Sequence, residues 1–140
     1  MTPLRLVQKW CQFLNTRNIP DLISLYGKNS VLMPTFSNKI ITSKKEMIDY
    51  YNLLHGKQVR LLSSSERKYP RPLSNIINGE YDFVSRSSSH KARYTFVFGM
   101  ENSDWKIVCH HSSLIPGESS FNVDVYKYLQ RCNRYLELKI

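Results

Sequence analysis

Two adjacent histidines near the end of the chain, His110 and His111, have the greatest capacity for chemistry at neutral pH. An imidazole can take up or release a proton in this range, and it can also bind a metal ion. Adjacent residues of a strand point to opposite faces of a sheet, so only one of the two can line a given pocket. Alternation leaves open which histidine is buried, and a lone buried histidine serves structure more often than catalysis.

Arg93 is the second candidate, because it lies in a segment of mostly apolar residues. Alternation along a strand places it on the face opposite to Tyr94 and Phe96. A guanidinium in a partly desolvated pocket offers a planar fork of donors that suits a carboxylate or phosphate. We therefore expect Arg93 to face a ligand pocket together with one histidine. The alternative is a salt bridge to Glu80 or Asp82 on a neighbouring strand.

Hydroxyl groups are expected to complete the lining of this pocket. Ser112 and Ser113 follow the histidines directly, but no glycine-framed turn surrounds them, which argues against a serine nucleophile. The predicted lining residues come from separate segments of the chain: Thr35, Tyr51 and Ser112 would supply hydroxyl groups, and Tyr81 an aromatic wall. Each of these side chains is equally credible as packing.

Some kinds of site lack the residues that they need. Proton abstraction next to a carbonyl needs a carboxylate base beside an oxyanion donor, and the segment around Pro34 carries no carboxylate. The cysteines, Cys11, Cys109 and Cys132, are widely spaced and form no zinc-ligand pattern with the histidines. We therefore expect no metal ion and no cofactor, and any catalytic base would be a histidine or a tyrosine.

The elements that position these residues follow from hydrophobic periodicity and from turn residues. Helices are predicted over 4–14, 18–27 and 43–54, the last beginning with a capping box of Ser43 and Glu46. Strands are predicted over 30–37, broken at Pro34, and over 58–65, 76–85, 90–100 and 104–115, with a loop or bulged connection at 67–75 and a last amphipathic helix from residue 122. Helices followed by a meander of strands predict an α+β domain.

The size and charge of the chain limit its class. With 140 residues it has the length of one ordinary domain. The N-terminal segment lacks the apolar core of a signal peptide, and no stretch approaches the length of a membrane span, so we expect a soluble cytoplasmic protein. The formal net charge of +9 could attract polyanions, but the basic residues are scattered, which argues against specific nucleic-acid binding.

Several motifs together resemble one family. They are LISLYGKNSVLMPTFSN at 22–38, the helix at 43–54, GEYDF at 79–83, ARYTFVF at 92–98 and WKIVCHHSSLIP at 105–116. The chain resembles the nuclear transport factor 2-like superfamily, and within it bacterial SgcJ/EcaC-type proteins similar to the calcium/calmodulin-dependent protein kinase II association domain. The resemblance implies a cystatin-like fold, in which a strongly bent antiparallel sheet forms a cone around the helices. We expect residues 1–118 to form this domain and residues 119–140 to add a helical extension that packs on it or on a partner subunit.

The resemblance leaves two functions open, because members of this superfamily use the cone differently. The first hypothesis is a noncatalytic module that holds a small anion or carboxylate and associates through its sheet into a dimer or larger homo-oligomer. The second is an isomerase, cyclase or hydrolase that uses His110 or His111 as general base and Arg93 to stabilise an oxyanion. The missing carboxylate favours the first hypothesis.

Overall fold

A computed structural model describes residues 1–54 and 56–117 of the chain. This described part of the fold contains three helices. They are α1 (Pro3–Asn15), α2 (Ile19–Ser24) and α3 (Lys44–Leu53). A side-chain oxygen caps the N-terminus of each: Thr2, Asn18 and Ser43 accept backbone N–H bonds from the first turns. Ser43 and Glu46, predicted as a capping box, do interact at this N-terminus: the backbone N–H of Glu46 donates to the Ser43 hydroxyl, which in turn donates to the carboxylate of Glu46 at 3.1 Å. The three helices are therefore confirmed.

Six strands form one mixed sheet. They are β1 (Tyr26–Met33), β2 (Gln58–Leu61), β3 (Ser65–Pro70), β4 (Leu73–Val84), β5 (Ser89–Glu101) and β6 (Asp104–Leu114). The order across the sheet is β1-β6-β5-β4-β2, with β3 also paired to β4. Strand β1 runs parallel to β6, and all the other pairs are antiparallel. The sheet is thus antiparallel as expected except at β1, whose parallel pairing with β6 is possible because α3 and β2 to β5 form a long crossover between the two strands.

The segment expected as a loop at 67–75 is mostly strand. Strand β3 pairs with the first half of β4 in a hairpin that turns at residues 71–72. All six residues of β3 are exposed, so no buried face gives the segment an alternating pattern. Backbone hydrogen bonds alone define this edge strand, and Pro70 fits its end because an edge position needs no donor to a further strand.

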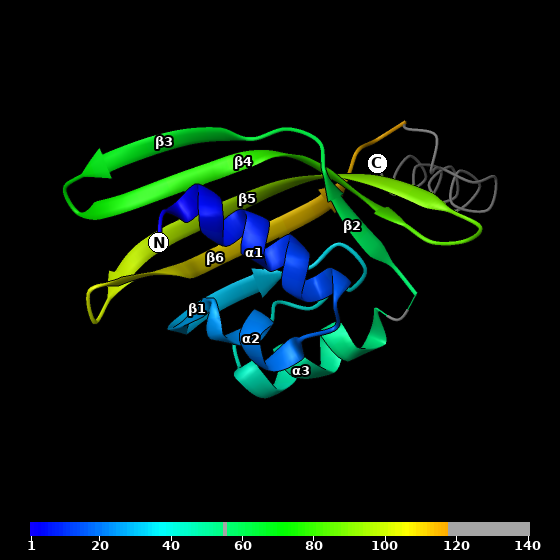
Figure 1. Ribbon diagram of the computed structural model, residues 1–140, viewed down its shortest axis with the longest axis horizontal. Helices are drawn as coiled ribbons and strands as arrows, with labels where there is room; N and C mark the ends of the chain where they lie inside the picture. The colour runs from blue at the N-terminus through cyan, green and yellow to red at the C-terminus, as the bar shows by residue number, and fades with distance from the viewer. Residues whose placement is uncertain (55, 118–140) are drawn as a thin grey trace, which may run out of the picture.

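The helices lie on one face of the sheet, so that each strand has an inner and an outer face (Figure 1). Residues on the inner face of β5, Ala92, Tyr94, Phe96 and Phe98, are buried, and so is Trp10 of α1. A bulge interrupts β6 at Val108, since Ile107 pairs with Phe98 while Cys109 already pairs with Val97. The bulge turns both Ile107 and His110 to the inner face, where they are 0% and 2% exposed.

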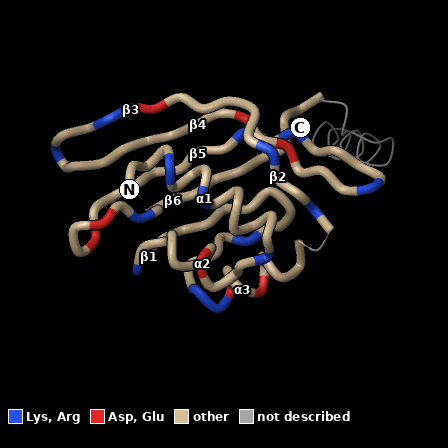
Figure 2. Tube along the Cα trace, in the orientation of Figure 1, with Lys and Arg blue, Asp and Glu red and all other residues tan. Residues whose placement is uncertain are grey.

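The fold agrees with the predicted α+β class. Lysines and arginines are spread over many elements of the described trace and form no continuous stripe in it (Figure 2). Within the described residues, no helix is both long and apolar enough to cross a membrane. The cytoplasmic location stays a prediction, and the predicted extension at 119–140 lies outside the described residues.

Candidate functional site

His110 lies in the centre of the cone between two tyrosines. Its Nδ1 is 2.8 Å from the hydroxyl of Tyr26 on β1, and its Nε2 is 3.1 Å from the hydroxyl of Tyr81 on β4. The ring also stacks on Phe96 of β5, with 3.9 Å between centroids. A neutral imidazole has one donor and one acceptor nitrogen, so one tyrosine donates to His110 and the other accepts from it. Both ring nitrogens are therefore occupied.

Burial decides the charge of this network. It lowers the pKa of His110 to about 3, with a smaller contribution from the charge of His111. Burial also raises the pKa of Tyr26, Tyr51 and Tyr81 well above the usual value for a phenol. At neutral pH the imidazole and all three phenols are thus uncharged. A histidine with so low a pKa is a weak general base near pH 7.

Trp10 of α1 and Tyr51 of α3 extend the network. The indole Nε1 of Trp10 donates to the hydroxyls of Tyr26 and Tyr51, at 3.1 and 3.3 Å. These two hydroxyls are also hydrogen-bonded to each other. Trp10 stacks on Tyr81 with 5.5 Å between the ring centroids, so its indole fills the space beside His110. A chain of hydrogen bonds therefore runs from Tyr51 through Tyr26 and His110 to Tyr81.

Little room is left for a ligand inside the cone. Next to the network, the hydroxyls of Thr35 and Ser112 are hydrogen-bonded to each other. The remaining cavity, which Tyr51, Tyr81 and His110 also line, has a volume of about 10 Å³. Such a cavity is at the lower limit for one water molecule. In this structure the inner polar groups therefore satisfy one another.

Arg93 lies on the outer face of the sheet and does not join this cluster. The residues opposite it and next to it on the outer face are Ser113, Thr95 and His111. They line an open groove of about 540 Å³, which also includes three serines at 63–65. The alternation of side chains along β5 explains this position. The apolar face of the strand packs against α1, so Arg93, which is on the opposite face, points away from the helices. The structure thus places Arg93 with one of the two histidines, His111, as expected, but corrects the expectation that Thr35, Tyr51, Tyr81 and Ser112 line the same pocket.

The predicted site residues therefore divide into two groups. The structure brings together Thr35, Tyr51, Tyr81, His110 and Ser112 in the cone, and it places Arg93 with His111 on the outer face. The predicted alternative for Arg93 is not formed either, because Asp82 pairs with Arg60 at 2.8 Å.

Sequence reasoning missed two members of the inner cluster, Trp10 and Tyr26. From the sequence, Trp10 could be recognised only as a core position of a helix. Tyr26 lies where a helix gives way to a strand, so neither periodicity assigned it to a site. They are 16 residues apart and far in sequence from His110. Among the described residues no group of three or more histidine, cysteine or acidic side chains could hold a metal ion.

Comparisons with known proteins identify the fold. No family model and no curated protein matches the chain. A solved structure from Xanthomonas campestris, assigned to the calcium/calmodulin-dependent protein kinase II association domains, is 29% identical with a TM-score of 0.73, over 81% of this chain and 85% of that one. An NTF2-like protein of unknown function from Pseudomonas putida is 15% identical, with a TM-score of 0.67 over 83% and 87%. A protein from Novosphingobium aromaticivorans assigned as a scytalone dehydratase is 10% identical, with a TM-score of 0.66 over 79% and 80%.

The bent sheet around three helices and these likenesses define the fold: the chain has the cystatin-like fold of nuclear transport factor 2-like proteins. Among proteins with this fold, the chain is similar to the Xanthomonas campestris protein assigned as an association domain, which confirms the resemblance seen in the motifs. The neighbours include proteins of unknown function and proteins assigned as dehydratases, so the shared fold does not fix one function.

Proposed function

We propose that this chain is a noncatalytic module that binds a small carboxylate or phosphate on the outer face of its sheet and associates with itself through the same face. The observation that carries the first part is the free guanidinium of Arg93. Among the described residues no carboxylate lies within salt-bridge distance of it, although Glu80 is its direct neighbour on β4. An exposed arginine without an internal partner retains its full capacity for an anion.

The surroundings of Arg93 supply further donors. Thr95 and Ser113 contribute hydroxyls, and His111 is an exposed imidazole on the neighbouring strand. A carboxylate that accepts two parallel hydrogen bonds from the guanidinium leaves lone pairs for such groups. Glu80, the neighbour of Arg93 on β4, repels a second negative charge, which favours a small ligand with its charge at one end. These features support binding in the groove and require no chemical step.

A reaction inside the cone has less support. The alternative function, an isomerase, cyclase or hydrolase, needs a histidine that reaches its substrate. His110 has both nitrogens occupied and a pKa lowered to about 3, and the cavity beside it has a volume of about 10 Å³. His111 is exposed on the other face, away from the enclosed environment in which a base and an oxyanion donor act together.

Self-association is supported by an apolar row across the outer face. Val31, Cys109, Val97 and Ile76 are neighbours on four successive strands, and each is only half-buried. No described helix covers this face (Figure 1). A contiguous apolar patch of this kind marks an interaction site. The Xanthomonas campestris relative is assigned as an association domain, which supports a second copy as the partner.

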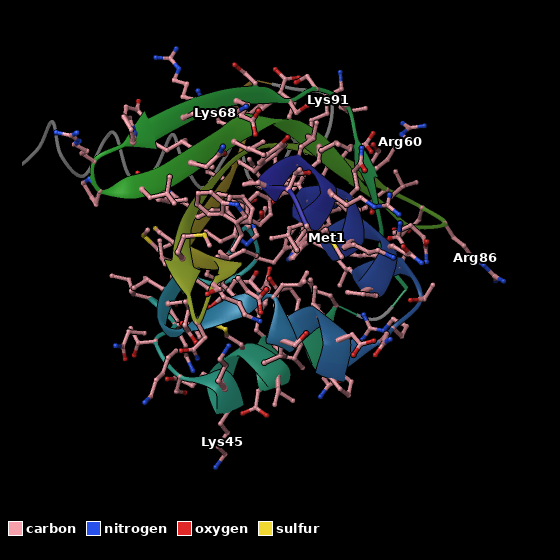
Figure 3. All side chains as sticks on the ribbon, turned by 60° about the vertical axis from the view of Figure 1, so that its left-hand side comes forward. Met1, Lys45, Arg60, Lys68, Arg86 and Lys91 are labelled. Carbon is pink, nitrogen blue, oxygen red and sulfur yellow. The ribbon has the colours of Figure 1, made fainter. Side chains whose placement is uncertain are left out.

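The anion site is tested with Arg93→Gln against Arg86→Gln, a control in which the arginine extends from the β4–β5 turn into solvent (Figure 3). Titration with succinate and with inorganic phosphate, followed by NMR, should shift the signals of Thr95 and His111 in the wild type. Loss of charge-assisted hydrogen bonds should weaken this binding by about tenfold or more in Arg93→Gln only. Equal affinity in the two variants would reject the proposed role of Arg93.

The assembly is tested with Val97→Glu, which places a charge in the middle of the apolar row. Sedimentation velocity should show a dimer or larger species for the wild type and a monomer for the variant. Ile48→Glu is the matched control, because Ile48 is an exposed apolar residue of α3 on another surface. A monomeric wild type, or an assembly that Val97→Glu leaves intact, would contradict the proposal.

A further inference from the structure

A second hollow lies at the end of the sheet where α1 begins. The β3–β4 and β5–β6 hairpins extend beyond the N-terminal turn of α1, so that the end of the sheet projects past the helix (Figure 1). The cleft between these three parts has a volume of about 880 Å³. Small-molecule sites span roughly 300 to 1,000 Å³. The cleft is separate from the Arg93 groove, because none of its lining residues belongs to that groove.

The walls of the cleft are apolar side chains that remain exposed. Met1, Leu4, Tyr69, Leu73 and Met100 line it, and each is between 36% and 71% exposed. They come from the start of α1, the β3–β4 hairpin and the end of β5. Large apolar side chains from separate elements that converge on one hollow indicate a binding site for an apolar ligand.

One buried side-chain oxygen in the wall lacks a hydrogen-bond partner among the described residues. Asn75 of β4 lines the cleft, is 2% exposed, and donates from Nδ2 to Glu66 Oε2 at 3.1 Å. A carboxylate only accepts, so Glu66 fixes the amide with its nitrogen toward β3 and its oxygen away from it. That oxygen, Oδ1, has no hydrogen-bond partner among the described residues. Buried acceptors are nearly always satisfied, so a small turn of the amide that brings Oδ1 to the cleft surface would let a donor from a bound molecule complete this site.

The charges around the cleft limit the ligand further. Glu66 and Lys68 lie 3.9 Å apart on β3, and Asp104 at the start of β6 also lines the cleft. Lys68 offsets Glu66 and Asp104 adds one negative charge, so the lining disfavours an anion, and the exposed apolar side chains favour an uncharged body. We infer that the cleft binds a neutral, mainly apolar molecule that carries one hydroxyl or N–H group, which donates to Asn75 Oδ1.

The test uses three probes with the same apolar body on the full chain. They are 2-naphthylmethanol, which has a donor, 2-methylnaphthalene, which has none, and 2-naphthoate, which is an anion. NMR titration should shift the side-chain amide of Asn75 and the indole of Trp105, another lining residue. The alcohol should bind about fivefold more tightly than the hydrocarbon, the usual effect of one neutral hydrogen bond. The anion should bind less tightly than either of them, because burying a charge without a partner is unfavourable.

Variants separate the donor bond from the apolar contacts. In Asn75→Leu the alcohol and the hydrocarbon should bind equally. If that variant does not fold, Leu73→Ser and Met100→Ser provide a second test, because both side chains are exposed and their replacement should not disturb folding. Each of these two variants should bind all three probes severalfold more weakly. Leu53→Ser is the control, since Leu53 of α3 is 79% exposed and far from the cleft in the chain.

Each outcome bears on the inference. Equal affinity of the alcohol and the hydrocarbon for the wild type would overturn the role of Asn75. Absence of binding, or binding that Leu73→Ser and Met100→Ser leave unchanged, would overturn the site itself. Neither result depends on Arg93, so the test of this cleft is independent of the test of the proposed anion groove.

Discussion

The hydroxyl of Tyr26 lies 2.8 Å from Nδ1 of His110 in the interior of the cone. This bond joins the first residue of β1 to the middle of β6, the parallel neighbour that α3 and four strands separate from it in the chain. Since Tyr81 of β4 bonds to the other ring nitrogen, His110 connects three strands through side chains alone. Its main role in this fold is therefore to hold the strands together.

Replacing His110 with alanine should lower the free energy of unfolding by about 3 kcal/mol, because it leaves a cavity and removes the partner of two buried hydroxyls. Urea denaturation measures the change. The control is His111→Ala on the exposed outer face, which should alter stability by no more than about 0.5 kcal/mol. Similar losses in the two variants would show that the buried network contributes little.

The stability of the fold should also depend on pH through His110. Its pKa is about 3 in the folded protein, against an ordinary value of 6.5. Between these values the unfolded chain binds a proton that the native state does not, so stability is full above pH 6.5 and falls as the pH is lowered towards 3. The slope should reach about 1.4 kcal/mol per pH unit. Urea denaturation between pH 7 and 4 should show a smaller slope for His110→Gln, and equal slopes would contradict this origin.

Trp10 is expected to be the residue that fills the cone. Its side chain is 1% exposed and packs against Tyr81 and His110. Trp10→Ala should therefore cost about 4 kcal/mol of stability, and added indole should restore part of it by occupying the cavity. Thermal unfolding with and without indole measures both effects. Leu14→Ala is the control, because its cavity is too small for indole, and a rescue of both variants would indicate nonspecific binding.

Most of the fold could be predicted because its signals are local. The apolar spacing in α1 and the Ser43–Glu46 box of α3 depend on residues three or four positions apart. Strand β3 escaped prediction because all six of its residues are exposed, so its only signal is the backbone pairing with β4. The predicted extension from residue 119 is not tested, since it lies outside the described residues.

The candidate site was harder to predict, because its geometry depends on long-range packing. Alternation could not choose between His110 and His111, since the bulge at Val108 changes the phase of β6. Strand β5 does alternate as predicted, but its apolar face is the one that faces α1, which puts Arg93 outside the cone. No local sequence pattern indicated that Tyr26 belongs to the site, because its hydrogen-bond partner His110 is 84 residues away.

Gly79 should tolerate no side chain, because the chain between β2 and β3 passes directly over it. A Cβ at this position would lie 2.1 Å from the carbonyl oxygen of Ser63. That backbone is fixed by a 2.7 Å bond from the hydroxyl of Tyr94 and by a 3.0 Å bond from the amide of Glu80 to Ser63 Oγ. Gly79→Ala must therefore displace hydrogen-bonded backbone, and we expect the free energy of unfolding, measured by urea denaturation, to fall by about 2 to 3 kcal/mol.

In the control, Gly99→Ala, the new methyl group meets only Cγ1 of the exposed Val108, at 3.2 Å, and this side chain can rotate away. Equal stability of the two variants would show that the connection at residues 62–64 moves freely, and would remove the close approach as the reason for glycine at this position.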